Sequence, residues 1–280
     1  MSGTLFLAAT PIGNPADASA RLVEILQSAD IVAAEDSRRA VRLLRDLDIT
    51  APGKIVSFYD AVEEAKSVDL VAAVQAGQTV VVISDAGMPT VSDPGYRIVQ
   101  HAIKAGVLVR VLPGPSAVLA ALAISGLATD RFTFEGFLNR KSGARVRQLN
   151  ELQFEPRTMV FFEAPHRLAE TISEMAQVFG ADRPAVICRE LTKTHEEIIR
   201  GSLSELETWC SGEILGEITL VVSGASPIDN SDPEQWIALT QSRVDLGISV
   251  RDAVADVAAE LNVPKREVYD AVITHRKKAD

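Results

Sequence analysis

The stretch TVVVISDAGMPTVSDPG, from Thr79 to Gly95, indicates both a fold class and a binding loop. It begins with a short apolar run rich in valine and isoleucine, which is typical of a strand covered on both faces in a parallel sheet. The loop that follows carries Asp85 and Asp93 among glycines and prolines, and glycine lets a backbone approach a ligand closely. Ligands of open α/β sheets bind beyond the carboxyl ends of the strands. The stretch therefore predicts an α/β protein with a binding site after this strand.

Both carboxylates of the loop also have a purely structural interpretation. Asp85 can cap a turn, and Asp93-Pro94-Gly95 can start the next helix with Pro94 near its first position. The sequence leaves a binding role and a structural role open for each residue.

Strand-turn-helix units repeat on either side of this stretch. Apolar strands are predicted at residues 5–9, 30–34, 54–58, 79–84 and 107–112, each followed by a turn and a helical pattern. The turn at Thr10 to Pro15 lacks the G-x-G-x-x-G fingerprint of dinucleotide sites, and the chain has no G-K-[ST] of a P-loop. Ser116 is placed to cap the helix after the last of these strands, or to help its N–H groups hold an anion. These units predict one α/β domain of usual size.

The second half predicts a smaller, mixed sheet and a helical tail. Strands are expected at 158–162, 185–189 and 217–223, with a hairpin partner at 197–200. Pro227, Asp229, Asn230, Asp232 and Pro233 indicate a linker before two helices. We therefore expect two α/β domains, at residues 1–128 and 129–225, followed by a linker and helical tail at 226–280.

Composition limits the class of protein. Hydrophobic residues make up 47% and charged residues 24% of 280 positions, which is ordinary for a globular enzyme. The longest apolar segment, residues 116–128, is too short to span a membrane, and the N-terminus has no signal-peptide pattern. Cys188 and Cys210 show no disulfide framework and no metal-ligand spacing, so we expect reduced, packed thiols. We expect a cytoplasmic protein without a metal site or membrane segment.

The net charge of −10 argues against broad, non-specific binding of nucleic acid, but basic residues are clustered locally. No acidic residue lies between Gly136 and Asn150, whereas the second cluster has acidic residues at its edges. The two clusters are Arg140, Lys141, Arg145 and Arg147, and Arg38, Arg39, Arg42 and Arg45. Each cluster is either a solvated helix face or a surface for phosphates.

Several motifs together resemble the ribosomal small subunit methyltransferase I family, which belongs to the tetrapyrrole methylase fold group. They occur in the family's order, cover about residues 5–224, and continue into a similar helical tail. The motifs are ATPIGNP (9–15), AAEDSRR (33–39), VISDAGMPTVSDPG (82–95), LPGPSAVLAAL (112–122), FEGFL (134–138), FFEAPHRL (161–168), CRELTKTHEE (188–197) and GEITLVVSG (216–224).

The resemblance implies an S-adenosylmethionine-dependent enzyme that methylates the ribose 2′-hydroxyl of a cytidine in the decoding region of 16S rRNA, in the 30S subunit. It implies the class III methyltransferase fold, in which the cofactor lies folded in a cleft between two α/β domains, and it implies a homodimer. The cofactor contacts carried over by motif are Pro11, Ser84, Asp85, Ala86, Met88, Ser116, Ala117, Phe162, Glu163, Leu191, Glu217, Ile218 and Thr219. Cations expected to hold RNA phosphates are Arg38, Arg39, Arg140, Lys141, Arg145, Arg147, Arg167 and Arg189.

The catalytic base, if one assists, is not identified by the sequence. A base could remove the hydroxyl proton as the new bond forms. The candidates from strand-end loops are Asp36, Asp85, Glu190 and Lys193, with Glu35 beside them. Glu190 and Lys193 could equally form a structural ion pair.

The sequence departs from the family pattern at two places. The loop after the third strand, FYDAVE at 58–63, lacks the His and Asn that the family often has there, and Asn139 replaces a proline in FLNRK.

Two other functions remain open from the sequence. A small-molecule, tetrapyrrole-like methyltransferase would share the cofactor loops. A non-enzymatic RNA-binding protein would not need those loops to converge on one pocket.

Overall fold

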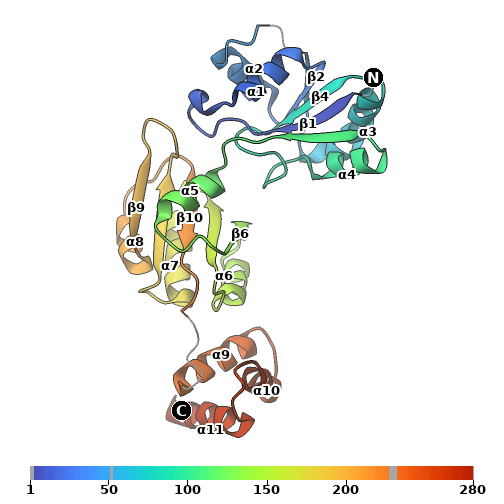
Figure 1. Cartoon of the computed structure of the whole chain (residues 1–280). Coiled ribbons are helices and arrows are strands. Elements are labelled where there is room, and N and C mark those ends of the chain that lie inside the picture. The colour runs from blue at the N-terminus through green and yellow to red at the C-terminus, as the bar shows by residue number, and fades with distance from the viewer. Residues whose placement is uncertain (1–2, 51–52, 227–231, 280) are drawn as a thin grey trace. The chain divides into compact units, whose positions relative to one another are not determined.

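The computed structural model describes residues 3–50, 53–226 and 232–279. Chain contacts separate two compact units (Figure 1). Unit 1 comprises Met1–Gly126, Ile187–Ile198 and Gly216–Thr219, and unit 2 comprises Leu127–Val186, Ile199–Leu215 and Leu220–Asp280. Of the predicted linker, Pro227, Asp229 and Asn230 lie outside the described residues.

The first sheet is parallel throughout, in the strand order β3-β2-β4-β1-β5. Leu5 pairs with Val80 on one side and with Val109 on the other. The strands are β1 (Thr4–Ala8), β2 (Ile31–Ala34), β3 (Lys54–Ser57), β4 (Thr79–Ile83) and β5 (Leu108–Leu112). The parallel sheet predicted from the valine-rich run is confirmed.

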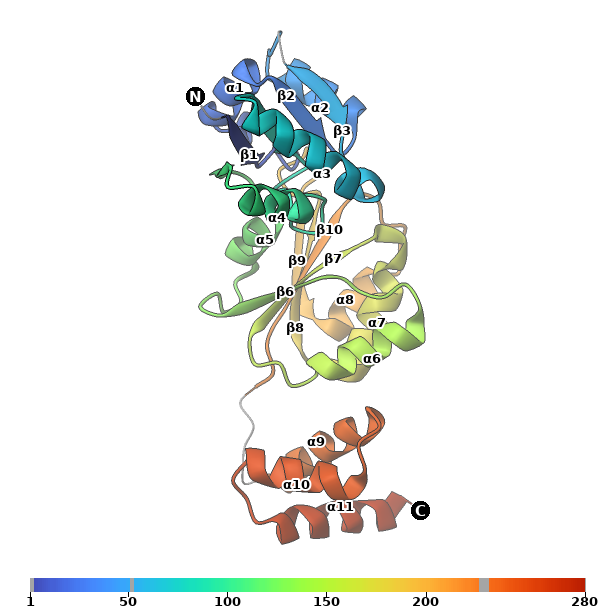
Figure 2. The ribbon, with the colours of Figure 1, turned by 90° about the vertical axis from the view of Figure 1, so that its right-hand side faces the viewer.

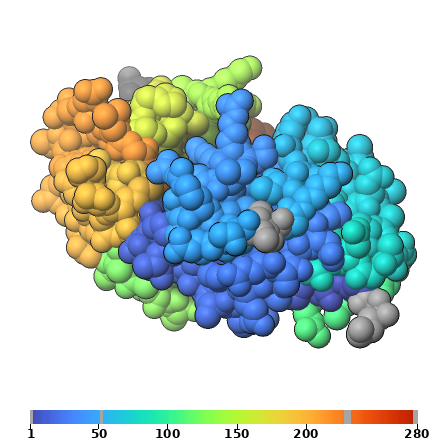
Figure 3. All heavy atoms as spheres, turned by 90° about the horizontal axis from the view of Figure 1, so that it is seen from above, coloured from blue at the N-terminus to red at the C-terminus, as the bar shows by residue number. Residues whose placement is uncertain are grey.

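Helices cover both faces of this sheet, which explains why its central strands are apolar along their whole length. Phe6, Val32 and Val81 point to the face that carries α1 and α2. Their neighbours Leu5 and Val80 point to the face that carries α3 and α4, and Figure 2 shows α3 running across the strands. The blue and cyan segments with α1 to α3 reach the surface in the space-filling view of Figure 3. The helices that follow the five strands in turn are α1 (Ala20–Ser28), α2 (Ser37–Asp46), α3 (Asp60–Gln75), α4 (Tyr96–Lys104) and α5 (Ala117–Ser125).

The second sheet has the strand order β6-β7-β10-β8-β9. Its strands are β6 (Phe132–Phe137), β7 (Thr158–Glu163), β8 (Pro184–Arg189), β9 (Glu197–Ser202) and β10 (Ile218–Val222). The helices α6 (Ser142–Leu152), α7 (Leu168–Phe179) and α8 (Leu203–Trp209) lie beside one another (Figure 2). Cys188 and Cys210 are buried and form no disulfide, as predicted, and burial raises the pKa of Cys210 to about 11.

The C-terminal helices α9 (Pro233–Asp245), α10 (Val250–Glu260) and α11 (Lys265–Ala279) form a separate apolar core around Trp236, Val254 and Val268. The sequence pattern predicts the last two helices but not α9. Asp232 accepts a hydrogen bond from the Glu234 amide at 2.9 Å, and Pro233 takes the first helical position. The Asp-Pro pair interpreted as linker is thus a helix start. Across the described residues, no helix combines the length and apolar character needed to cross a membrane.

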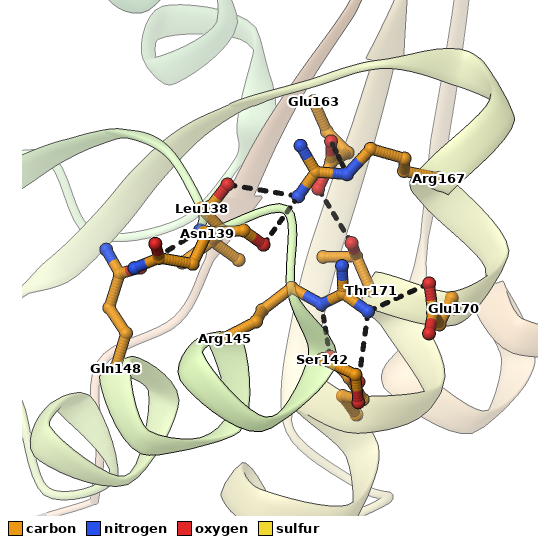
Figure 4. A network of polar contacts seen from close by, with 10 residues as sticks. Leu138, Asn139, Ser142, Arg145, Gln148, Glu163, Arg167, Glu170 and Thr171 are labelled. Carbon is orange, nitrogen blue, oxygen red and sulfur yellow. Dashed lines mark hydrogen bonds and ion pairs between the residues drawn. The ribbon is translucent and has the colours of Figure 1, made fainter.

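A buried ion pair in unit 2 corrects one sequence-based expectation (Figure 4). Arg145 on α6 is fully buried, and its guanidinium binds Glu174 on α7 and lies 2.9 Å from a carboxylate oxygen of Glu170. Ser142 donates to Glu174 at 2.7 Å. Burial opposes ionisation of Glu174, but the bonds from Arg145 and Ser142 outweigh it and lower its pKa. Arg145 therefore joins α6 to α7, and the prediction that it contacts RNA is wrong. The sequence shows a run of cations but does not reveal which of them points into the protein.

The ion pair predicts unequal effects of removing its two carboxylates. Glu174→Ala leaves a fully buried guanidinium without its main partner, so the free energy of unfolding should fall by about 3–5 kcal/mol. Glu170→Ala is the matched control, because Glu170 is 60% exposed and should cost less than about 1 kcal/mol. Urea unfolding of both variants provides the measurement. An equal loss of unfolding free energy in the two variants would contradict the assignment of Glu174 as the main partner of Arg145.

Candidate functional site

The loop after β4 is held in an unusual backbone conformation. Thr90 and Ser92 have φ angles of 78° and 64°, in the left-handed region that non-glycine residues rarely adopt. The buried carboxylate of Glu63, in the first turn of α3, accepts hydrogen bonds from the amides of Gly95 at 2.9 Å and Arg97 at 2.8 Å. Strained backbone persists only where surrounding contacts hold it. Glu63 is therefore the anchor of this loop, a role that the sequence did not indicate.

Carboxylates link the loop after β4 to the start of α2. Asp85 accepts a hydrogen bond from the Asp36 amide at 3.0 Å, and it lies 3.4 Å from the Arg39 guanidinium. Glu35 in turn accepts from the Asp85 amide at 3.3 Å. Asp36 caps α2 by accepting from the Arg38 amide at 2.7 Å. Asp36 and Asp85 therefore both have structural partners, whatever further role they have.

Asp93 lies among these carboxylates and does not cap α4. That helix begins at Tyr96 with Gly95 as its N-cap, so only Gly95 of the predicted Asp93-Pro94-Gly95 start lies at the helix terminus, and Pro94 does not take the first helical position. Burial, and next the charge of Glu35, raise the pKa of Asp93 from its ordinary 3.8 to about 7, against a hydrogen bond with Ser84. Burial also raises the pKa of Glu35. The cluster can therefore exchange a proton near neutral pH.

The loops after β1, β4 and β5 converge at Gly87. Thr10 and Gly87 exchange backbone hydrogen bonds of 2.9 and 3.1 Å. A Cβ at Gly87 would lie 3.6 Å from a methyl carbon of Ile12 and 3.9 Å from the carbonyl oxygen of Pro115. Ser116 accepts from the Leu119 amide at 3.5 Å and so caps α5, which is its predicted structural role. The structure thus brings together three loops that carry sequence-predicted cofactor contacts, Pro11, Ala86, Met88 and Ser116 among them.

A second strained segment, residues 190–196 of unit 1, packs against the loop after β1. Glu190 and Thr192 have φ angles of 52° and 64°. The Thr192 amide donates to Glu196 at 2.6 Å, and the Thr192 hydroxyl accepts from the Asn14 amide at 3.1 Å. A Cβ at Gly13 would lie only 2.4 Å from Lys193 Cγ, so glycine is required there.

Lys193 is held as a cation between two carboxylates. Its ammonium lies 2.7 Å from Glu190 and 3.0 Å from Glu217. Burial opposes the charge, but the hydrogen bonds to these carboxylates outweigh it and raise the pKa of Lys193. An ammonium with a raised pKa has no lone pair to accept a proton near neutral pH. Lys193 therefore forms a structural ion pair with Glu190 and Glu217 and is unsuited to acting as a base.

An open cavity of about 690 Å³ lies at this segment. Its volume is in the range of small-molecule sites, and its lining is largely polar. The lining residues are Gly13, Asn14, Pro15, Glu190, Thr192, Lys193, Thr194 and His195. Within the described parts of the chain, no three His, Cys, Asp or Glu side chains are grouped so as to hold a metal ion.

In unit 2, Glu163 and Arg167 lie in one polar network (Figure 4). Buried Glu163 accepts from the Thr171 hydroxyl and the Ala164 amide, both at 2.7 Å. Arg167 donates to the carbonyl oxygens of Leu138 at 3.0 Å and Asn139 at 2.9 Å. One terminal nitrogen of Arg167 and both carboxylate oxygens of Glu163 thus have hydrogen-bond partners within the protein.

The remaining predicted residues differ in exposure. Arg38, Arg39, Arg140, Lys141 and Arg147 are exposed. Arg189 is half-buried and pairs with Glu197 at 3.0 Å. Leu191, Ile218 and Thr219 are buried, whereas Glu217 is exposed. The five exposed cations are accessible to phosphate groups of a bound RNA.

Comparison with known proteins identifies the family. The profile described as "Tetrapyrrole (Corrin/Porphyrin) Methylases" matches residues 4–207. A protein of Mycobacterium tuberculosis (strain CDC 1551 / Oshkosh) named "Ribosomal RNA small subunit methyltransferase I" is 52% identical over 99% of this chain and 96% of its own length. The chain belongs to the ribosomal RNA small subunit methyltransferase I family. A Bacillus subtilis (strain 168) member of this methyltransferase I family is 40% identical over 96% of this chain and 94% of its own length.

Structural comparison supports the same fold group for this methyltransferase I family member. A uroporphyrin-III C-methyltransferase from Thermus thermophilus, solved in complex with S-adenosyl homocysteine, superposes with a TM-score of 0.55. It covers 78% of this chain and 96% of its own, at 20% identity, a likeness that concerns the fold alone. The family and the tetrapyrrole methylase fold expected from the motifs are both confirmed.

The raised pKa of Asp93 predicts a pH-dependent stability effect. The folded state disfavours the Asp93 carboxylate, so the free energy of unfolding should fall as pH rises from about 4 through 7. Asp93→Asn removes that charge, and the variant should be more stable than the parent at pH 8 but little different at pH 4. Urea unfolding at both values provides the measurement. Asp69→Asn, at an exposed position on α3, is the control. If the free energy of unfolding of Asp93→Asn changed with pH as much as that of the parent protein, the prediction would be wrong.

Proposed function

We propose that this protein transfers a methyl group from S-adenosylmethionine to the ribose 2′-hydroxyl of a cytidine in the decoding region of 16S rRNA, in the small ribosomal subunit. The observation that carries the proposal is the 52% identity, over 99% of this chain, to a protein named Ribosomal RNA small subunit methyltransferase I. The choice of cytidine and of the 2′-hydroxyl rests on the motif resemblance.

The convergence of three loops at Gly87 supports a cofactor site there. Short backbone approaches and the N-terminus of α5, capped by Ser116, suit a carboxylate such as that of the methionyl group. We assign Pro11, Ser84, Asp85, Ala86, Met88, Ser116 and Ala117 to this part of the site. From the second half of the chain we assign Phe162, Glu163, Leu191, Glu217, Ile218 and Thr219. Because the carboxylate of Glu163 binds Thr171 and Ala164, its backbone is the part available to the cofactor.

The cofactor supplies the methyl group on a sulfonium. The task of the protein is to align the ribose oxygen with the methyl carbon and to exclude water. The Lys193 ammonium bridges Glu190 and Glu217 and so orders the segment that carries them. Hydrogen bonds to Lys193 and the Glu217 amide outweigh burial and lower the pKa of Glu190, which weakens it as a base. Asp36 and Asp85 stay in the set of possible bases, and Asp93 joins it because a pKa of about 7 matches neutral conditions.

The exposed cations Arg38, Arg39, Arg140, Lys141 and Arg147 are the proposed contacts to RNA phosphates. The net charge of −10 restricts such binding to local surfaces. From the family resemblance we also propose a homodimer that acts in the cytoplasm on the 30S subunit.

A tetrapyrrole-like small-molecule methyltransferase is the second candidate, because a uroporphyrin-III C-methyltransferase shares the fold. Identity to that protein is only 20%, against 52% to the rRNA methyltransferase, which favours the RNA substrate.

The function is tested with purified protein, labelled S-adenosylmethionine and 30S subunits from a strain that lacks the modification. We expect label in 16S rRNA, at a 2′-O-methylcytidine of the decoding region when the nucleotide is mapped. Label on a base, or on a tetrapyrrole in preference to RNA, would refute the proposal. Calorimetry with the cofactor alone separates an enzyme from an RNA-binding protein that needs no cofactor.

Single alanine variants test for a catalytic base. A positioned base contributes about 10²–10⁴-fold to turnover, so at least one of Asp36→Ala, Asp85→Ala, Glu190→Ala and Asp93→Ala should lower kcat by about 10²-fold at saturating cofactor. Asp69→Ala, exposed on α3, is the control. If all four variants keep near-parental kcat, alignment alone accounts for the reaction.

A further inference from the structure

An exposed aromatic ring ends the edge strand β6 in unit 2. Phe137 is 56% exposed, and its ring lies 5.6 Å from that of Phe162, centroid to centroid. Phe162 in turn lies 4.9 Å from Phe134 in an edge-to-face contact. The three rings form an aromatic cluster with Phe137 as its exposed member, defined here as the Phe137 platform.

A backbone irregularity creates this platform. The pairing of β6 with β7 shifts register between Phe134 and Gly136, and Gly136 has a φ of 65°. In a regular strand, residues 134 and 137 would point to opposite faces of the sheet. The bulge inserts one residue and turns Phe137 toward Phe162, where a register without it would aim the ring away. Bulges recur where a side chain has to be re-aimed for function.

Two exposed cations follow the platform closely. Arg140 and Lys141 lie three and four residues after Phe137 and are both exposed. No carboxylate occurs in the chain between Gly136 and Asn150. In a protein with a net charge of −10, an exposed ring followed within four residues by two exposed cations suits an anionic partner with flat apolar faces.

The backbone that carries these side chains is held from three directions (Figure 4). Arg167 donates hydrogen bonds to the carbonyl oxygens of Leu138 at 3.0 Å and Asn139 at 2.9 Å. The side-chain oxygen of Gln148 accepts from the Asn139 amide and side chain, both at 3.2 Å. Beyond Lys141, the ion pair of Arg145 with Glu174 fixes the first turn of α6. A rigid segment loses little conformational freedom on binding, so its contacts contribute more to affinity.

We propose that Phe137 stacks on an unpaired base of the substrate RNA while Arg140 and Lys141 bind the adjacent phosphates. This rests on the proposed function and deepens it, because it assigns a single-stranded segment as the feature the protein selects. Bases within a duplex have no free face, whereas single-stranded RNA is recognised by aromatic stacking combined with backbone cations. The arginines on either side, Arg145 and Arg167, act as positioning residues of this segment and not as phosphate contacts.

Equilibrium titrations with single-stranded octaribonucleotides and with unmodified 30S subunits test the proposal. Phe137→Leu should weaken binding by about 5- to 150-fold, and Phe137→Trp should restore it. Phe132→Leu is the matched control, since Phe132 is 36% exposed at the other end of the same strand. Arg140→Ala and Lys141→Ala should each reduce the slope of log affinity against log salt by about 0.7, whereas Phe137→Leu should leave the slope unchanged.

Abasic substitutions identify the stacked nucleotide. Each octaribonucleotide carries one abasic position, and one of these positions should weaken binding to the parent protein as much as Phe137→Leu does. Removing the same base should not weaken RNA binding by the Phe137→Leu variant any further, because the ring and the base form a single interaction.

Three results would overturn the stacking proposal. The first is unchanged RNA affinity in Phe137→Leu. The second is a larger loss of cofactor affinity than of RNA affinity in calorimetry, which would make Phe137 a wall of the cofactor site. The third is an altered sedimentation coefficient, which would make the platform a self-association surface. Methylation of 30S subunits by the parent protein is measured in parallel, so an inactive parent refutes the proposed function and an active parent with insensitive Phe137 refutes only the stacking.

Discussion

Two backbone hydrogen bonds between Thr10 and Gly87 hold the strand-end loops of unit 1 together. They join the loop after β1 to the loop after β4, the two strands that are neighbours in the middle of the parallel sheet. Gly87 has a φ of 75°, and a Cβ at this position would lie within van der Waals range of Ile12 and Pro115, so the loop after β5 meets the same point. Three loops far apart in sequence thereby present their backbone groups in one place.

Carboxylates then hold the loops that this bridge brings together. Glu63 anchors the end of the loop after β4, Asp85 joins that loop to the start of α2, and Glu196 holds the strained segment at Thr192. Each carboxylate accepts a backbone N–H that would otherwise lack a partner inside the loop. Strain at Thr90, Ser92, Glu190 and Thr192 is concentrated at these loops, which is where binding and catalytic residues are commonly found.

Cations of one sequence cluster divide between the inside and the surface of unit 2. Arg145 is fully buried against Glu174, while Arg140, Lys141 and Arg147 are exposed. Buried guanidinium groups need partners, and carboxylates of the neighbouring α7 provide them for Arg145. The same division separates Arg167, which binds main-chain carbonyls, from the cations free to meet phosphates. The buried contacts of Arg145 and Arg167 thus order the segment that carries the exposed Arg140 and Lys141.

The sequence by itself determined the α/β class, the parallel first sheet, the capping position of Ser116, and the family. These follow from strand hydrophobicity, local capping chemistry and motif order, all of which are properties of neighbouring residues. Only the tertiary structure decided that Arg145 is buried, that Glu63 anchors a loop thirty-two residues away, and that the bulge turns Phe137 toward Phe162. It also decided that Asp93 lies beside Glu35 and Ser84, which makes it a carboxyl that titrates near pH 7. Burial and pairing arise when distant segments pack together, and the order of residues along the chain does not record those contacts.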